Sequence, residues 1–143
     1  MELGRRGLDG RREAGAFLLA SRSMDERRVV RAIYFDELDP CCLVGHIHLR
    51  SGAYSKLWDL CDEEGLHVIA DVHTHPSAQV TQSDVDRDNP MIAREGHLAL
   101  IVPWYATRPV RAHEVGVHQY CGDLGWRSWL GPKAERVLLI RRH

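Results

Sequence analysis

Two histidines and an aspartate within residues 71–86 have the spacing of a divalent metal site. His73 and His75 are separated by one residue, so on an extended segment both side chains point to one face. Ser83 and Asp86 are three residues apart, which puts them on one face of a helix. Two histidines and one aspartate leave one position of a tetrahedral metal open for water, as in catalytic rather than structural zinc sites.

A pair of histidines alone is weak evidence, because the sequence contains nine of them. The second His-x-His pair, His46 and His48, has no carboxylate at a helical offset, and we interpret it as surface or core histidines. The first pair differs because Pro76, Ser83 and Asp86 follow it in order. No Pro-Cys-x-x-Cys follows either pair, which argues against a zinc deaminase.

The elements around these residues are predicted to be mostly strands. A strand leads directly into His73, and a helix begins near Ser83, as the metal site requires. Ser51 can cap an earlier helix, and Gly65 can end it. We predict strands over 16–21, 29–35, 42–49, 66–72, 97–102, 110–120 and 137–140, and helices over 51–64 and 83–94, the second interrupted near Pro90.

Size and charge place these elements in one soluble domain. The chain has 143 residues and a net charge of -1, which gives no reason to expect nucleic acid or a membrane as the main partner. We predict a mobile, Gly- and Arg-rich lead-in over 1–12 and one domain over 13–143. Four scattered arginine pairs are interpreted as solvated surface: Arg5-Arg6, Arg11-Arg12, Arg27-Arg28 and Arg141-Arg142.

The cysteines and the start of the chain favour the cytoplasm. None of the four cysteines, Cys41, Cys42, Cys61 and Cys121, lies in a Cys-x-x-Cys motif, which favours reduced thiols. Arg11-Arg12 before an apolar run faintly suggests a twin-arginine signal. The run is short and follows acidic residues, so we interpret it as a strand of the domain.

The order His-x-His-Pro, Ser83, Asp86 resembles the JAMM motif of the MPN-domain metalloproteases. The resemblance implies an α/β (α+β) single domain whose cytidine-deaminase-like sheet is flanked by helices. It implies Zn2+ held by His73, His75 and Asp86. The family also uses a glutamate ahead of an apolar, Leu-rich run, and Glu13 before residues 14–19 fits that pattern.

The resemblance implies catalytic roles for two further side chains. Glu13 would be the base that takes a proton from the attacking water and returns it to the leaving amine. Ser83 would donate a hydrogen bond to the developing oxyanion, although it can also cap a helix beside the metal, and both roles can coexist. Asp84 and Asp71 are candidate supporting or solvated carboxylates, and Asp71 is the weaker of the two.

Residues 89–94 and 96–103 are similar to bacterial JAMM proteins encoded beside ubiquitin-like activating and conjugating enzymes, including anti-phage operons of the Bil and CBASS kinds. The implied function is an isopeptidase or peptidase that cleaves after the C-terminus of a ubiquitin-like protein, with those enzymes as further partners. An extended substrate tail could add to a sheet edge.

Two other functions fit the same motif. A catalytically silent MPN scaffold would bind partners without a metal. Such relatives usually lack one or more of the five motif residues, and this sequence has all five: Glu13, His73, His75, Ser83 and Asp86. A RadC-like JAMM protein would act in DNA metabolism, which the near-neutral charge disfavours.

One departure from the family concerns the region before Glu13, where relatives usually have a strand and a helix. The element is absent, a partner chain completes the edge, or the true start lies upstream. The aromatic side chains Trp104, Tyr105, Trp126 and Trp129 are interpreted as core or strand-edge residues, with a partner surface as the alternative.

Overall fold

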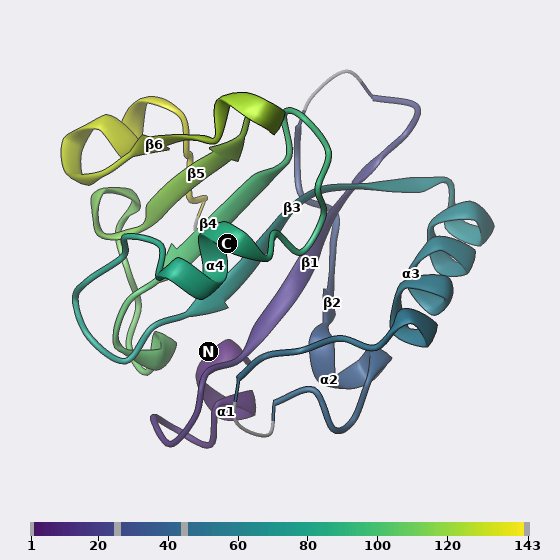
Figure 1. The fold of residues 1–143 in the computed structure, drawn as a ribbon, viewed down its shortest axis with the longest axis horizontal. Helices are drawn as coiled ribbons and strands as arrows, with labels where there is room; N and C mark the ends of the chain where they lie inside the picture. The colour runs from purple at the N-terminus through teal and green to yellow at the C-terminus, as the bar shows by residue number, and fades with distance from the viewer. Residues whose placement is uncertain (1, 25–26, 44–45, 142–143) are drawn as a thin grey trace.

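A computed structural model describes residues 2–24, 27–43 and 46–141 (Figure 1). A six-stranded sheet with the order β2-β1-β3-β4-β5-β6 forms its centre, and within it β3 and β4 are parallel while the other neighbouring pairs are antiparallel. The strands are β1 Gly15–Ser21, β2 Arg31–Tyr34, β3 Leu66–Thr74, β4 Leu98–Val102, β5 Gly116–Tyr120 and β6 Trp126–Trp129. The helices are α1 Glu2–Arg6, α2 Phe35–Leu38, α3 Ser51–Glu64 and α4 Asp84–Asp88, with 3-10 turns η1 Trp104–Ala106, η2 Ala112–Glu114, η3 Gly122–Leu124 and η4 Gly131–Arg136.

The predicted α+β single domain with a sheet flanked by helices is confirmed, and so is its long helix. α3 begins at Ser51 and ends at Glu64, as predicted. Gly65 has a φ of 65°, a left-handed conformation that favours glycine, and its N–H donates to the carbonyl of Cys61. Ser51 is the first helical residue rather than the cap, because Arg50 holds the cap position without a side-chain hydrogen bond.

Two predicted strands are wrong, and one strand was missed. The described part of 42–49 has no strand, because Asp39 organises this stretch as a loop by accepting hydrogen bonds from the backbone of Cys41 and from the backbone and guanidinium of Arg50. The stretch 137–140 is irregular. The missed strand is β6, which is the last strand of the described chain.

The predicted helix over 83–94 is much shorter in the structure. α4 ends at Asp88, and Asn89 follows it with a φ of -129° and a ψ of 68°. Pro90 has no N–H to donate and disfavours a helical conformation at the residue before it, so the helix stops there instead of continuing past an interruption.

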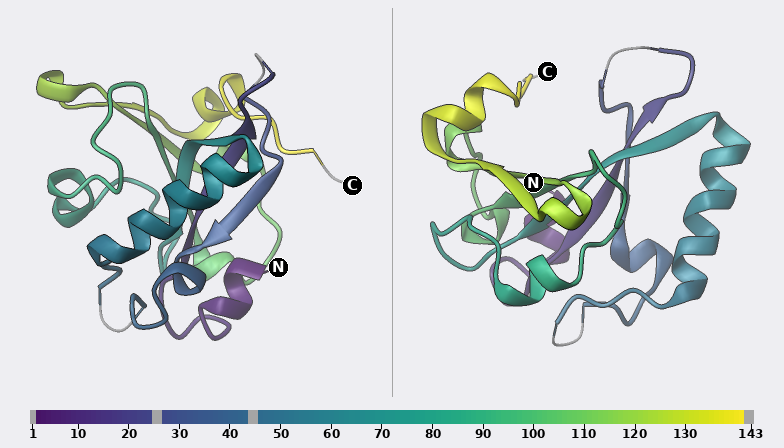
Figure 2. Two further views of the ribbon diagram at one scale, coloured as in Figure 1. Left: turned by 90° about the vertical axis from the view of Figure 1, so that its right-hand side faces the viewer. Right: turned by 45° about the horizontal axis from the view of Figure 1, so that its top comes forward.

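The sheet has one apolar cluster on each face. Phe17 and Leu57 lie in the cluster between the sheet and α3. Val72 and Leu100 lie in the cluster on the opposite face, where the C-terminal residue Leu138 packs. Figure 2 shows α3 and α4 on one side of the sheet and the C-terminal segment on the other. The two faces therefore have different neighbours.

An extra residue in β3 decides which face carries the histidines. The register between β1 and β3 shifts by one residue and leaves Ile69 without a partner on β1. Val68, before this bulge, packs in the cluster under α3, but Ala70 and Val72, after it, pack on the opposite face. The extra residue exchanges the two faces of the strand. His73 therefore points to the side of the sheet that carries α3.

The segment over 1–12, predicted as a mobile lead-in, contains the helix α1. The guanidinium of Arg6 forms ion pairs with Glu2 and Asp36 at 2.7 and 2.8 Å. It also lies 4.1 Å from the centre of the Tyr34 ring. These contacts attach α1 to β2 and α2, a packing that the sequence prediction did not include.

Among the described residues, no helix combines the length and the apolar character needed to cross a bilayer.

Candidate metal centre and its cavity

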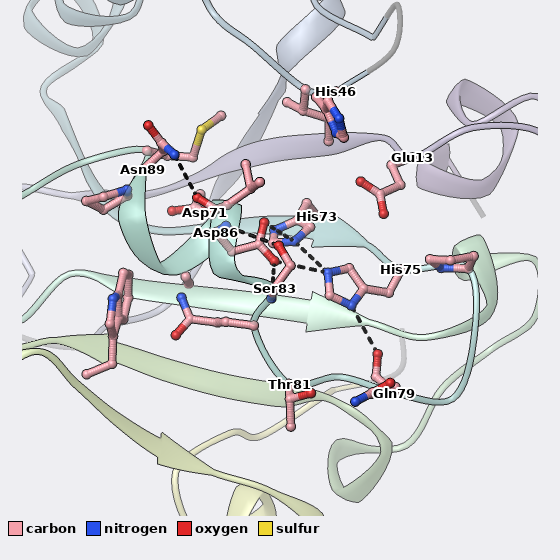
Figure 3. A pocket seen from close by; sticks show the side chains of 18 of the residues that line it. Glu13, His46, Asp71, His73, His75, Gln79, Thr81, Ser83, Asp86 and Asn89 are labelled. Atoms are coloured by element: carbon pink, nitrogen blue, oxygen red, sulfur yellow. Dashed lines mark hydrogen bonds and ion pairs between the residues drawn. The ribbon is translucent and has the colours of Figure 1, made fainter.

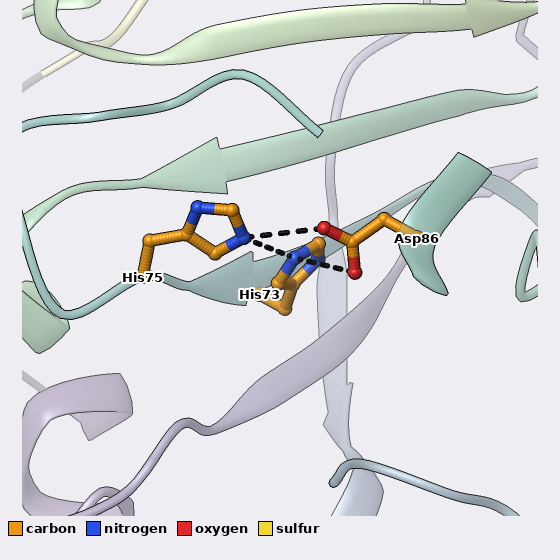
Figure 4. A group of neighbouring side chains, drawn as sticks. All are labelled: His73, His75 and Asp86. Atoms are coloured by element: carbon orange, nitrogen blue, oxygen red, sulfur yellow. Dashed lines mark hydrogen bonds and ion pairs between the residues drawn. The ribbon is translucent and has the colours of Figure 1, made fainter. Parts of the chain in front are cut away.

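The side chains of His73, His75 and Asp86 converge at one point (Figure 4). His73 Nε2 lies 3.1 Å from His75 Nε2 and 3.4 Å from Asp86 Oδ1. His75 Nε2 lies 3.3 Å from Asp86 Oδ2. The two imidazoles come from the end of β3 and the residue after it, and the carboxylate comes from α4. The three predicted ligands are thus brought together.

These separations fit a tetrahedral metal ion. Zinc lies about 2.0–2.1 Å from nitrogen and oxygen ligands, so two ligand atoms of a tetrahedron are about 3.3–3.4 Å apart. The observed distances of 3.1, 3.3 and 3.4 Å lie close to that value. The three side chains can therefore bind such an ion with little rearrangement.

A backbone carbonyl orients His75 toward the centre. The carbonyl of Gln79 accepts a hydrogen bond from His75 Nδ1 at 3.0 Å, which leaves the lone pair of Nε2 for a metal when the ring is neutral. Burial alone would lower the pKa of His75, but the contacts with Asp86 and Gln79 outweigh burial and raise the pKa above its usual value. A proton therefore competes with a metal for this ring at acidic pH.

Asp86 is held by the start of α4. Its Oδ2 accepts a hydrogen bond from the Ser83 N–H at 2.8 Å, and its own N–H donates to Ser83 Oγ at 3.1 Å. This reciprocal capping satisfies two backbone donors at the helix start. Burial alone would raise the pKa of Asp86, but the hydrogen bonds with His73 and His75 outweigh burial and hold the pKa well below its usual range.

Glu13 precedes β1, the strand next to β3, and lies beside His75. Gly15 of β1 pairs with His73, and the Thr74 N–H donates to the Ala14 carbonyl, so the register places Glu13 beside the second histidine. Its carboxylate has no hydrogen-bond partner among the described residues, and it lines the same cavity as the three ligands. A side chain at Gly15 would lie 2.3 Å from the Phe35 ring, so this approach requires glycine.

The loop over residues 76–82 is fixed against β5. His118 Nε2 donates to the carbonyl of Val80 at 2.9 Å, and the other ring nitrogen lies 2.7 Å from Ser128 Oγ. Burial lowers the pKa of His118, which keeps the ring neutral and able to accept from Ser128. Gly116 leaves room for the loop, since a Cβ there would lie 2.1 Å from the Val80 oxygen.

A left-handed turn holds the other end of this loop. Trp104, Tyr105 and Ala106 have φ values of 55°, 51° and 53°, which residues other than glycine seldom adopt. The Trp104 N–H donates to the Ser77 carbonyl at 3.1 Å, and the Tyr105 N–H donates to the His75 carbonyl at 2.8 Å. The strained turn thus positions the backbone of one ligand.

Replacing Gly116 with alanine is expected to lower the free energy of unfolding by about 1–3 kcal/mol, the usual cost of overpacking. The added methyl group would meet the Val80 oxygen and displace the loop. Thermal unfolding of the purified variant measures the effect. Gly52→Ala is the matched control, because nothing lies within 4 Å of its Cβ position on α3, and alanine there is expected to stabilise by about 0.5–1 kcal/mol. An unchanged Gly116→Ala variant would contradict the proposed role of this contact.

A cavity of about 450 Å³ surrounds the centre. Figure 3 shows Glu13 and His46 on one side of the ligands and Gln79 and Thr81 on the other. Trp126 lines it as well, and its indole N–H donates to the Arg87 carbonyl of α4 at 3.2 Å. The three candidate ligands therefore lie between two groups of cavity-lining side chains.

The structure makes the sequence analysis more specific at three positions. His46 lines the cavity, whereas His48 is exposed and does not. Asp84 is 87% exposed and pairs with Arg87, so it does not support the ligands. Asp71, the weaker candidate, is buried in the cavity floor, and its Oδ2 lies 2.6 Å from Nε2 of His97. Sequence spacing could not place His46 at the cavity or His97 beside Asp71, because both positions depend on tertiary contacts.

One solved structure of another protein has a similar architecture. The solution structure of a Desulfitobacterium hafniense protein matches with a TM-score of 0.59 and 19% identity, over 90% of this chain and 83% of that chain. The crystal structure of a JAB1/MPN domain protein from Archaeoglobus fulgidus matches with a TM-score of 0.46 and 18% identity, over 82% and 80%. The family described as prokaryotic homologs of the JAB domain matches residues 6–115. Because this match spans well over half of the chain, the protein belongs to the prokaryotic JAB domain family.

Proposed function

We propose that this protein is a zinc-dependent peptidase or isopeptidase that cleaves after the C-terminus of a ubiquitin-like protein. The observation that carries the proposal is the convergence of His73, His75 and Asp86 in a cavity that Glu13 and Ser83 also line. Two imidazoles and one carboxylate suit zinc and leave a position free for chemistry. When bound, zinc would supply a Lewis acid that lowers the pKa of water toward about 7 and polarises a carbonyl.

We propose that Glu13 moves the proton in such a reaction. Its carboxylate faces the cavity without a hydrogen-bond partner among the described residues, so both oxygens are available to accept a proton. The water oxygen forms the new bond to the carbonyl carbon, and the amide C–N bond breaks. The proton that Glu13 accepts from water then goes to the leaving nitrogen.

Ser83 has a hydroxyl proton to donate. Its Oγ accepts the hydrogen bond of the Asp86 N–H at 3.1 Å, which uses a lone pair and leaves the O–H free. The capping role and the oxyanion role are therefore compatible. The donor would act on the charge that develops on the carbonyl oxygen.

Replacing Ser83 with glycine separates these two roles. Glycine at a helix N-cap costs only a few tenths of a kcal/mol, whereas losing an oxyanion donor lowers turnover by about 10²–10³-fold. We expect Ser83→Gly to keep its metal and its melting temperature and to lose turnover, and Ser83→Thr to keep activity. Steady-state kinetics with thermal unfolding distinguish the effects. Equal turnover for glycine and serine would remove Ser83 from the chemistry.

The substrate class rests on the resemblance of residues 89–94 and 96–103 to proteins of bacterial ubiquitin-like pathways, of the Bil or CBASS kind. We infer a cytoplasmic enzyme whose substrate is the flexible tail of the carrier protein, with the leaving group a lysine ε-amine or an α-amine. The cognate activating and conjugating enzymes are proposed as further partners.

Incubation with fusions of ubiquitin-like proteins tests the function. Zinc-loaded protein is expected to release the carrier protein with its C-terminus intact, and prior treatment with a chelator is expected to abolish release until zinc is restored. Mass spectrometry of the products locates the cut. Cleavage that persists after chelation and metal analysis confirming zinc loss would contradict the mechanism.

A further inference from the structure

The sheet face opposite α3 and α4 carries a second concave surface. A groove of about 730 Å³ has a floor of aliphatic side chains from β1, β3, β4 and β5. Leu18, Ala70, Leu98, Leu100 and Val117 form this floor, and Trp129 of β6 borders it. The C-terminal residues Leu138 and Leu139 form one wall. The metal centre lies on the other face, so the groove is separate from it.

The edge of the groove carries exposed apolar side chains. Leu139 is 75% exposed, Val137 is 48% exposed, and Val29 is 46% exposed, and all three line the groove. Exposed apolar side chains that adjoin an apolar groove mark an interaction site. Layered domains bury both faces of a sheet, and on this face Leu138 packs with Ala106 of η1 and Ala134 of η4, while the groove stays open beside them.

Three arginines line the groove: Arg27, Arg28 and Arg141. Among the residues that the structure describes, no aspartate or glutamate lines it. None of the three forms an ion pair with another residue in the described part of the chain. The Arg27-Arg28 pair, interpreted from the sequence as solvated surface, thus borders an aliphatic floor.

The concave shape, the aliphatic floor and the arginines together indicate which class of molecule the groove can bind. A second copy in a two-fold arrangement would bring the same arginines against one another, which is unfavourable. A membrane suits protruding apolar side chains better than a concave floor. Single-stranded nucleic acid needs aromatic side chains for stacking, and the floor is aliphatic. A protein segment with aliphatic and acidic side chains fits the concave shape, the aliphatic floor and the arginines.

We propose that the groove docks an amphipathic helix of an acidic partner protein, with aliphatic residues on the floor and carboxylates against Arg27, Arg28 and Arg141. A helix lying in the groove would cover the part of this sheet face that is open. The proposal does not depend on zinc or on peptidase activity.

A charge exchange tests the proposal with a display library of helical peptides as the probe. Peptides selected on the parent protein are expected to be acidic, with aliphatic residues at helical spacing, and to bind more weakly as salt increases. Selection on the Arg28→Glu/Arg141→Glu variant is expected to yield basic peptides. Both arginines are exposed, so the variant should fold.

Fluorescence anisotropy with the tightest-binding acidic peptide measures the change in affinity that each variant causes. We expect at least about tenfold weaker binding to the double variant, equal to about 1.4 kcal/mol, and weaker binding to Leu139→Ser. The control Arg11→Glu/Arg94→Glu changes the net charge equally outside the groove and should bind like the parent. Four results would each overturn the proposal. The selected peptides could show no charge preference, or the control variant could lose as much peptide affinity as the double variant. The parent could instead form a dimer that the double variant abolishes, or bind phosphatidylserine vesicles.

Discussion

Replacing Glu13 with glutamine is expected to lower turnover by about 10²–10⁴-fold, the usual contribution of a general base. Glutamine has nearly the same shape as glutamate but does not accept a proton at neutral pH. The side chain lines the cavity without a hydrogen-bond partner among the described residues, so the fold loses no contact there. Single-turnover cleavage of a carrier fusion by zinc-loaded protein measures the loss.

Two further measurements make the Glu13 result specific. The zinc content of Glu13→Gln should equal that of the parent, because the three ligands are unchanged. Glu63→Gln, at an exposed position of α3, is the control and should keep full activity. Full activity in Glu13→Gln would assign the base to another group, and loss of zinc would make Glu13 part of the metal site.

Replacing His75 with alanine is expected to abolish both zinc binding and cleavage. The change removes one of three ligands and also releases the Gln79 carbonyl, which accepts the hydrogen bond of this ring. In the parent, zinc at 100 times its dissociation constant should stabilise the fold by about 2.7 kcal/mol. A thermal shift on zinc addition should therefore appear in the parent and not in the variant.

The second His-x-His pair provides the control for this result. His48 is exposed and does not line the cavity, so His48→Ala should keep both the thermal shift and the activity.

Since the pKa of His75 is raised, its protonation competes with zinc, and the apparent zinc affinity of the parent should fall as the pH decreases through that pKa. Retained zinc binding by His75→Ala would contradict the ligand assignment.

The fold was predictable where local sequence decides the structure. α3 has apolar residues at helical spacing and Gly65 at its end, so both its bounds could be read directly. The stretch 42–49 alternates like a strand, but its described residues form no strand, and Arg50 beside them is hydrogen-bonded to Asp39 instead. β6 is short and contains two tryptophans, and its pairing with β5 is a tertiary property that local patterns do not contain.

The site shows the same division. The three candidate ligands were predictable because the chemistry of a metal constrains residue type and spacing together. The groups that support them were not, since Val80 and His118 are far apart in the sequence and meet only in the folded sheet. The left-handed turn at Trp104 uses residues that carry no signal for that conformation.

The bulge at Ile69 has a consequence for insertions and deletions. Deleting this residue would restore regular alternation along β3 and turn His73 toward the arginine-bordered groove, while most strand hydrogen bonds could still form. Chains that are one residue longer or shorter between residues 69 and 75 should therefore lose metal binding before they lose the fold. Substitutions within the same stretch that keep its length leave the orientation of the ligands unchanged.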